Sequence, residues 1–116
     1  MSELKINNNK IKRRITMNIK KKKDGNTLTV VISGRIDTAT APGASASINE
    51  SLDDVQSLIL DFTGVDYISS AGLRMLLALQ KKMMARDGMK LIGVNDDVND
   101  VFEVTGFDEI LTYEKR

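Results

Sequence analysis

The spacing of apolar and polar residues predicts a β-hairpin at the start of the folded part of the chain. Residues 16–20 alternate in polarity, as a half-buried strand does, and residues 21–26 are predicted to form the turn because Asp24-Gly25 favours a tight hairpin. Residues 27–34 are apolar or β-branched at nearly every position. This second run predicts a strand that is covered on both faces.

Helical and strand patterns alternate after this hairpin. Apolar residues recur at helical spacing over 38–52, with Thr38 or Thr40 as the cap and Pro42 in the first turn. The next patterns are a buried strand at 55–62, a loop at 63–69 and a long helix from Ser70 or Ala71 to about Arg86. They are followed by a strand at 89–94, a short acidic helix at 98–104 that Gly106 closes, and a last short strand or helix at 110–113.

The order of these elements defines the expected fold class. A β-β-α-β-α-β-α order predicts a single-domain α/β fold with a mixed sheet of four to five strands, which is parallel in the middle and antiparallel at the N-terminal hairpin. Three to four helices accompany the sheet. We expect residues 1–14 to be a flexible basic arm and residues 15–116 to form the domain.

The 116 residues include no Cys, no His and no Trp. Disulfides, the common zinc sites and Ser-His-Asp arrangements are therefore excluded. A nucleophilic serine at position 70 would need another base, and Lys81 and Lys82 lie about three helical turns further on. We expect a protein that is not an enzyme and that uses no cofactor or metal. Without a long apolar run or a signal peptide, we expect no membrane span and a cytoplasmic location.

The net charge of +1 conceals a basic start and an acidic remainder. Residues 1–23 contain nine Lys or Arg and one acid, a balance of +8, which leaves eight basic and fifteen acidic residues, a balance of −7, in 24–116. The basic clusters are interpreted as solvated segments, with contact to nucleic acid or anionic lipid as the alternative. No aromatic residue interleaves with them, which argues against binding to single strands, and no direct nucleic-acid partner is expected.

The most informative segment runs from a buried strand through a polar loop into the long helix. Ser70 stands where that helix begins, so its hydroxyl can accept a hydrogen bond from a first-turn N–H. Gly72 lets a bulky group approach the first turn. A phosphate on a serine at a helix N-terminus is electrostatically favoured and adds about two negative charges, so such a serine can be both a cap and a switch. The alternative is that Ser70 is only a cap and that Asp61 and Thr63 only order the loop.

This segment resembles the signature of STAS domains, and more narrowly of bacterial anti-sigma factor antagonists. The resemblance rests on Asp61-Phe62-Thr63 and on the run from Ile68 to Leu73, which reads Ile-Ser-Ser-Ala-Gly-Leu. It extends to the Gly34-Arg35-Ile36-Asp37 turn and to Thr105-Gly106-Phe107. It covers roughly residues 17–114, nearly all of the chain except the basic arm.

The resemblance implies a partner-switching mechanism that regulates transcription. The unphosphorylated antagonist binds an anti-sigma factor that is also a GHKL-type serine kinase, phosphorylation releases that kinase, and a PP2C-like phosphatase resets the switch. Aligned on Gly72-Leu73, the phosphoacceptor falls on Ser70, with Ser69 as the second choice. The residues assigned to partner binding are Asp37, Asp61, Thr63, Ser69, Ser70, Gly72 and Met75.

The sequence departs from the family signature at two positions. Well-known members of the family have Asp where this chain has Ser69, and Ser or Thr where it has Ala71.

The alternative function is a STAS subunit of a larger assembly, such as a lipid-transport ATPase, that is not phosphorylated. The stripe of Met75, Leu79 and Met83 on the long helix is predicted either to lie in the core or to form part of a partner face, where Met is an adaptable contact residue.

Overall fold

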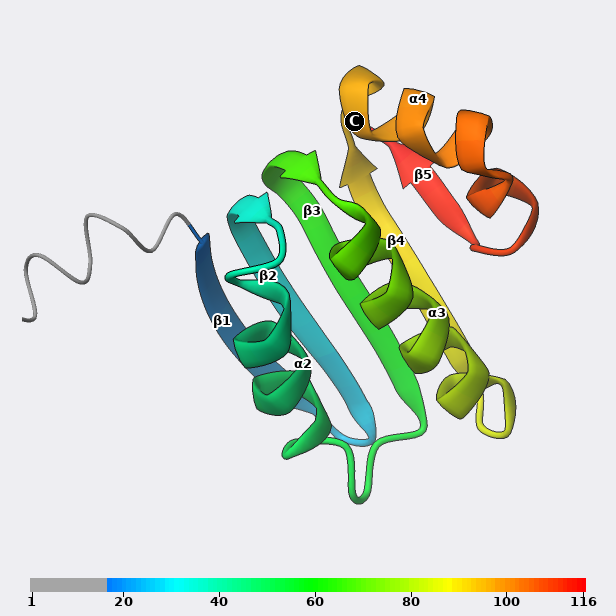
Figure 1. Ribbon diagram of the computed structural model, residues 1–116. Helices are drawn as coiled ribbons and strands as arrows, with labels where there is room; N and C mark the ends of the chain where they lie inside the picture. The colour runs from blue at the N-terminus through cyan, green and yellow to red at the C-terminus, as the bar shows by residue number, and fades with distance from the viewer. Residues whose placement is uncertain (1–16) are drawn as a thin grey trace, which may run out of the picture.

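The computed structural model describes residues 17–116, which form a five-stranded mixed sheet with three α-helices (Figure 1). The strands are β1 (Met17–Asp24), β2 (Thr27–Ile36), β3 (Ser57–Ile68), β4 (Gly88–Val94) and β5 (Tyr113–Lys115), and they lie in the order β1-β2-β3-β4-β5. The helices are α2 (Ala41–Asn49), α3 (Ser70–Met84) and α4 (Asp96–Thr105), followed by the short 3₁₀ helix η1 (Phe107–Glu109). Strand β1 pairs with β2 antiparallel and all other pairs are parallel, which confirms the predicted fold class.

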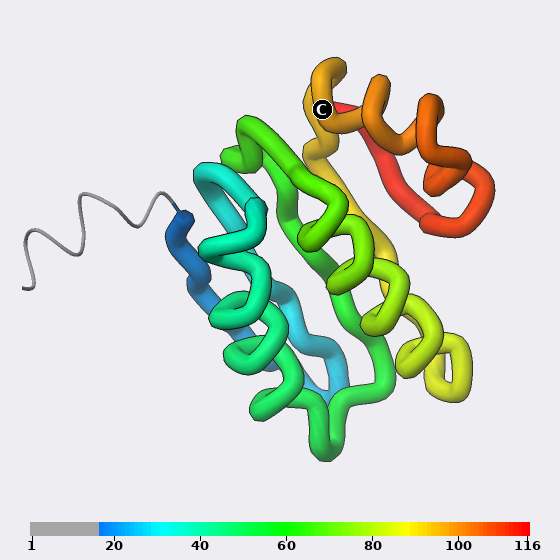
Figure 2. Tube along the Cα trace, in the orientation of Figure 1, coloured from blue at the N-terminus to red at the C-terminus, as the bar shows by residue number. Residues whose placement is uncertain are grey.

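The chain path explains how a parallel sheet forms in sequence order. Figure 2 shows each parallel connection returning to the start of the sheet through a helix or loop, so that successive strands lie side by side. All of the parallel strands consequently end at the same edge of the sheet. That edge is where β2 passes into the turn before α2 and where β3 passes directly into α3.

The N-terminal hairpin is longer than predicted, because residues 21–24 belong to β1 rather than to the turn. Alternate lysines of this strand reach α2 and the segment after it. Lys21 Nζ donates to the carbonyl of Ser47 at 2.9 Å and pairs with Glu50 at 3.2 Å, and Lys23 pairs with Asp54. Pairing with β2 continues to Asp24, which lies opposite Thr27, so the turn is reduced to Gly25 and Asn26.

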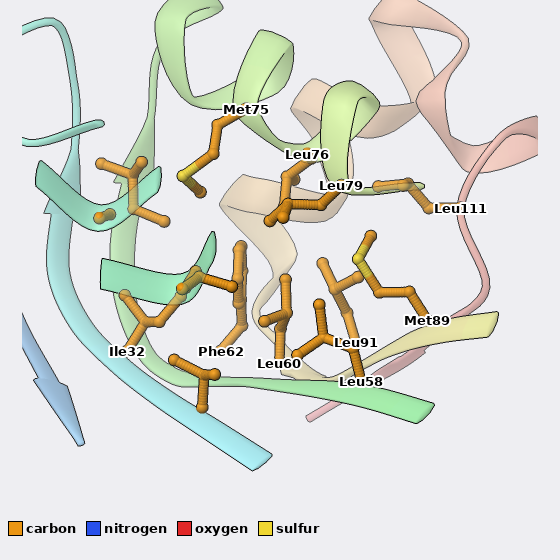
Figure 3. Close-up of a cluster of buried hydrophobic side chains, with 14 of the residues drawn as sticks. Ile32, Leu58, Leu60, Phe62, Met75, Leu76, Leu79, Met89, Leu91 and Leu111 are labelled. Atoms are coloured by element: carbon orange, nitrogen blue, oxygen red, sulfur yellow. The ribbon is translucent and has the colours of Figure 1, made fainter. Parts of the chain in front are cut away.

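The core lies between the sheet and the helices on one of its faces. Leu58, Leu60 and Phe62 point toward α3, and Leu76 and Leu79 of α3 point back toward them (Figure 3). The other face of the sheet is only partly covered, so the prediction that β2 is buried on both faces is wrong. Val31 is 39% exposed because the helices of the described region cover only the opposite face.

Strand β3 continues through the segment predicted to be a loop. Its pairing with β2 runs to Ile68, with one extra residue in β3 between the pairs Val31–Asp61 and Ser33–Gly64 and another before Arg35–Tyr67. Such bulges keep a strand paired while interrupting the alternation of its side chains. The polar sequence of 63–67 therefore looked like a loop although its backbone is in the sheet.

Several predicted ends move by a few residues. Helix α2 ends at Asn49, before the predicted residue 52, and α3 ends at Met84. Helix α4 begins after Asn95, whose side chain accepts from the Val98 N–H at 2.8 Å, and it ends at Gly106 in the left-handed conformation, as predicted. The last element was predicted at 110–113, but η1 ends at Glu109 and β5 begins only at Tyr113. No helix of residues 17–116 is long and apolar enough to cross a membrane.

The methionine stripe of α3 belongs to the core. Met75, Leu79 and Met83 are 5%, 1% and 0% exposed, which supports the core interpretation over the partner face. Figure 3 shows Met75 and Leu79 directed from α3 toward the sheet. The neighbouring Met84 is 71% exposed and points away from it.

The adjacent methionines provide a matched test of this packing. Met83→Ala is expected to lower the free energy of unfolding by about 2–5 kcal/mol, because it removes a fully buried side chain. Met84→Ala is expected to change it by less than about 0.5 kcal/mol. Urea unfolding followed by circular dichroism measures both values, and equal effects of the two substitutions would contradict the assignment of Met83 to the core.

Candidate functional site

The candidate site lies at the edge of the sheet where β2 and β3 end. The backbone N–H of Ser69 donates to the carbonyl of Ile36 at 2.8 Å, which ties the start of α3 to the end of β2. Asp37 follows Ile36 directly, so this bond brings the turn before α2 next to the start of α3. Of the residues predicted for partner binding, the structure thus gathers Asp37, Ser69, Ser70 and Gly72 at one place.

The two serines have different surroundings. Ser69 is the N-cap of α3, with an extended backbone (ψ 178°), and its Oγ accepts from the Gly72 N–H at 3.5 Å. Ser70 is the first residue of the helix and is exposed. Within residues 17–116, the Ser70 hydroxyl makes no hydrogen bond. The prediction that Ser70 is the cap is therefore wrong, because the backbone geometry places Ser69 in that position.

Gly72 allows α3 to pack closely on the ends of both strands. A Cβ atom at this position would lie 2.6 Å from Cγ1 of Ile68 and 2.9 Å from Cγ2 of Ile36, both of them buried. Distances under 3 Å are too short for carbon atoms, so any side chain would push the helix away from the strands. The predicted close approach at Gly72 is confirmed, and the bulky groups are these two isoleucines.

Asp37 organises the turn that leads into α2. Its Oδ1 accepts from the backbone N–H of Ala39 at 3.0 Å and from that of Thr40 at 3.1 Å. Desolvation alone would raise the pKa of Asp37, but the hydrogen bonds from Thr40 and Ala39 and the nearby charge of Arg35 outweigh it and lower the pKa below its ordinary value. Asp37 is thus held as a carboxylate next to Ser69. Thr40 is the N-cap of α2 but makes no side-chain cap, since its hydroxyl bonds the Arg35 carbonyl instead.

Arg35 and Tyr67 form a second feature of the site that the sequence did not reveal. The guanidinium of Arg35 lies 4.2 Å from the centroid of the Tyr67 ring, and its Nε is 3.7 Å from Asp37. Both side chains are partly exposed at the ends of adjacent strands. The register that places Arg35 opposite Tyr67 depends on the bulges of β3, so no local sequence pattern would have paired them.

A groove of about 420 Å³ runs between α2 and α3 beside these serines. It is lined by Thr38, Ala41, Pro42, Ser45, Ala71, Arg74, Met75 and Ala78. The only charged residue among them is Arg74. Small residues at helical spacing on both helices keep the groove open, and that spacing is the sequence signal that could have revealed it. Met75 reaches the groove as part of its largely buried lining.

Asp61 and Thr63 lie away from this cluster. Their positions on β3 are seven and five residues before Ile68, which places them roughly 16–23 Å along the strand from its end. The Asp61 carboxylate accepts from the Thr63 N–H at 3.0 Å, and the Thr63 carbonyl accepts from Arg116 at 2.7 Å. Asp61 thus bonds within its own strand and Thr63 contacts Arg116, and the structure does not bring either residue next to Ser70.

The family of the chain follows from this fold and from a direct comparison. The model of the STAS domain family matches residues 7–116, so the chain belongs to that family. The anti-sigma-B factor antagonist of Listeria monocytogenes is 31% identical over 97 residues, which cover 78% of this chain and 82% of the relative.

Solved structures show the same fold. The crystal structure of an anti-sigma factor antagonist from Mycobacterium paratuberculosis matches with a TM-score of 0.78 over 86% of each chain, at 23% identity. The structure of the Bacillus cell fate determinant SpoIIAA in the phosphorylated form matches with a TM-score of 0.66 over 85% of this chain and 93% of the other, at 16% identity. These likenesses establish a SpoIIAA-like STAS fold.

The close packing at Gly72 can be tested against a glycine at the same helical position. Gly72 and Gly43 are each the third residue of their helix, but a Cβ on Gly43 would meet no atom within 4 Å. Gly72→Ala is expected to lower the free energy of unfolding by about 1–3 kcal/mol through overpacking. Gly43→Ala is expected to raise it by about 0.5–1 kcal/mol because alanine favours the helix. Destabilisation of similar size in both variants would contradict the proposed role of Gly72.

The charge of Asp37 predicts a pH-dependent contribution to stability. Because the folded pKa lies below the unfolded value of 3.8, the carboxylate stabilises the protein above that pH, and this contribution is lost as the pH falls through the folded pKa. Asp37→Asn removes the charge but keeps one acceptor oxygen. Urea unfolding of both proteins between pH 7 and pH 2.5 should show wild type more stable at pH 7 and the difference shrinking below about pH 4. A difference that stays constant over this range would show that the charge is unimportant.

Proposed function

We propose that this protein is an anti-sigma factor antagonist whose partner binding is switched by phosphorylation of Ser70. The unphosphorylated form binds an anti-sigma factor that is also a GHKL-type serine kinase, and thereby frees the sigma factor for transcription. The kinase transfers the terminal phosphoryl group of ATP to the Ser70 hydroxyl. The phosphorylated form releases the kinase, and a PP2C-like phosphatase restores the hydroxyl.

The observation that carries this proposal is the division of roles between the two serines. A kinase needs an exposed hydroxyl, and the Ser70 side chain is exposed and free of hydrogen bonds to residues 17–116. The Ser69 hydroxyl is partly buried and caps the helix. Phosphorylation of Ser70 therefore leaves the cap of α3 in place, which favours Ser70 over Ser69 as the acceptor.

The surroundings of Ser70 explain how one phosphate could end binding without unfolding the domain. Ser70 lies beside the groove between α2 and α3, close to the hydrogen-bonded turn of Asp37 and the close packing at Gly72. A phosphate adds about two negative charges, so the balance of residues 24–116 would change from −7 to about −9. A partner surface that fits a small neutral hydroxyl would meet a larger, hydrated anion at the same place.

The names of the relatives support the same role. The Listeria monocytogenes relative is named as an antagonist of an anti-sigma factor, and SpoIIAA has been solved in a phosphorylated form. In this proposal the chain is the substrate of chemistry that other proteins perform, and it acts in the cytoplasm, where its partners are. The STAS subunit of a transport ATPase remains the alternative function.

Recovery of the partner from the protein's own cells tests this function. The full chain is tagged and expressed in its own organism as wild type, Ser70→Ala and Ser70→Asp, and the co-purified proteins are identified by mass spectrometry. We expect a GHKL-type kinase with wild type and with Ser70→Ala. Ser70→Asp should recover at least tenfold less, because it places a negative charge on the binding surface.

Ser69→Asp serves as the comparison for a charge at the neighbouring position. Aspartate is a good N-cap, so this variant should keep the helix start intact and lose less binding than Ser70→Asp. The proposal fails if the kinase is recovered equally with wild type and Ser70→Asp. It also fails if the recovered partners are transporter subunits, an outcome that would establish the alternative function.

A further inference from the structure

Arg74 is an exposed cation that lines the groove between α2 and α3. It is exposed on α3, one turn beyond Ser70, and within residues 17–116 it forms neither an ion pair nor a hydrogen bond. The other arginine close to the site, Arg35, contacts Asp37 and Tyr67. Arg74 is therefore the guanidinium at this surface that remains available to a new anion.

The spacing of Ser70 and Arg74 places their side chains together. Residues four apart on a helix are neighbours, with Cβ atoms about 5–6 Å from each other. Helical side chains also tilt toward the N-terminus, so a long side chain at 74 lies over the turn that contains residue 70. An anion that precedes a cation by four residues is the favourable order of such a pair.

The residues at the start of α3 would not repel a phosphate on Ser70. The first turn of α3 contains no acidic residue, whereas that of α4 contains Asp96 and Asp97. Of the carboxylates near the site, Asp66 of β3 lines a separate hollow shared with Asp97 and Val101 of α4, and Asp37 Oδ1 is already occupied by N–H groups of its own turn. An arginine can bind a phosphate through two parallel N–H donors, which is stronger than a single contact.

We infer that Arg74 is the internal counterion of phosphoserine 70 and that it leaves the groove when Ser70 is phosphorylated. This inference rests on the proposed phosphorylation of Ser70. Phosphorylation then changes the partner surface twice, because it adds a dianion at residue 70 and withdraws from the groove its only charged lining residue. The partner chemistry that fits the unphosphorylated groove is an apolar segment with a carboxylate that meets Arg74.

Phosphorus NMR of the phosphorylated protein tests the pair without any kinase. Phosphoserine is installed at position 70 of the full chain by genetic encoding, and the second pKa of its phosphate is measured by titration. A paired guanidinium favours the dianion, so wild type should have the lower pKa. Arg74→Gln should raise it by roughly 0.15–0.4 unit, as expected for a helical pair of this spacing. Arg74→Lys, which keeps the charge but loses the two-pronged geometry, should lie between them.

Lys81→Gln is the matched control for the loss of one positive charge from α3. Lys81 is exposed on the same helix but lies about three turns from residue 70, so its removal should leave the phosphate pKa unchanged. Equal pKa values in wild type and Arg74→Gln, or an equal rise in Lys81→Gln, would overturn the inference. Because the phosphate is installed directly, this result is independent of whether a kinase is recovered from cells. Failure of the pair and failure of the switch are thus distinguishable.

Discussion

The arrangement of the site depends on the close contact between the first turn of α3 and the ends of two strands. Gly72 lies against Ile36 of β2 and Ile68 of β3, while the Ser69 N–H bonds the Ile36 carbonyl at 2.8 Å. Since Asp37 follows Ile36 in the chain, the same contact fixes the turn that starts α2. The groove between α2 and α3 and the exposure of Ser70 follow from it, because both depend on where α3 begins. A helix start pushed away from the strands would alter all of these features together.

This geometry separates two tasks that neighbouring serines could otherwise share. Ser69 stabilises the helix start, and Ser70 presents its hydroxyl to the surrounding solvent. A modification of Ser70 can therefore change the charge of the surface while the helix keeps its cap. That combination suits a regulatory protein, because binding to a partner can be controlled by electrostatics alone.

The sequence predicted the order of the elements, the mixed sheet, the capping of α4 and the close approach at Gly72, because each depends on local residue patterns. It misplaced Lys21 and Lys23 in a turn, although they pair with Val30 and Leu28 of β2, because their side chains meet partners about thirty residues away that no local pattern reveals. It also assigned the cap to Ser70, because two adjacent serines are equally good caps by residue type and only the backbone angles distinguish them. The pairing of Arg35 with Tyr67 could not be predicted, since the two bulges in β3 determine which residues face each other.

We propose Ser70 as the residue through which the protein is switched. The most direct measurement is to purify the untagged chain from its own cells under several growth conditions and to locate phosphate by intact mass and fragmentation mass spectrometry. The account predicts a single phosphate on Ser70, in a proportion that changes with growth condition, and none on Ser69. Phosphate on Ser69 would contradict the assignment of the site, and a chain that carries no phosphate under any condition would contradict the switch itself.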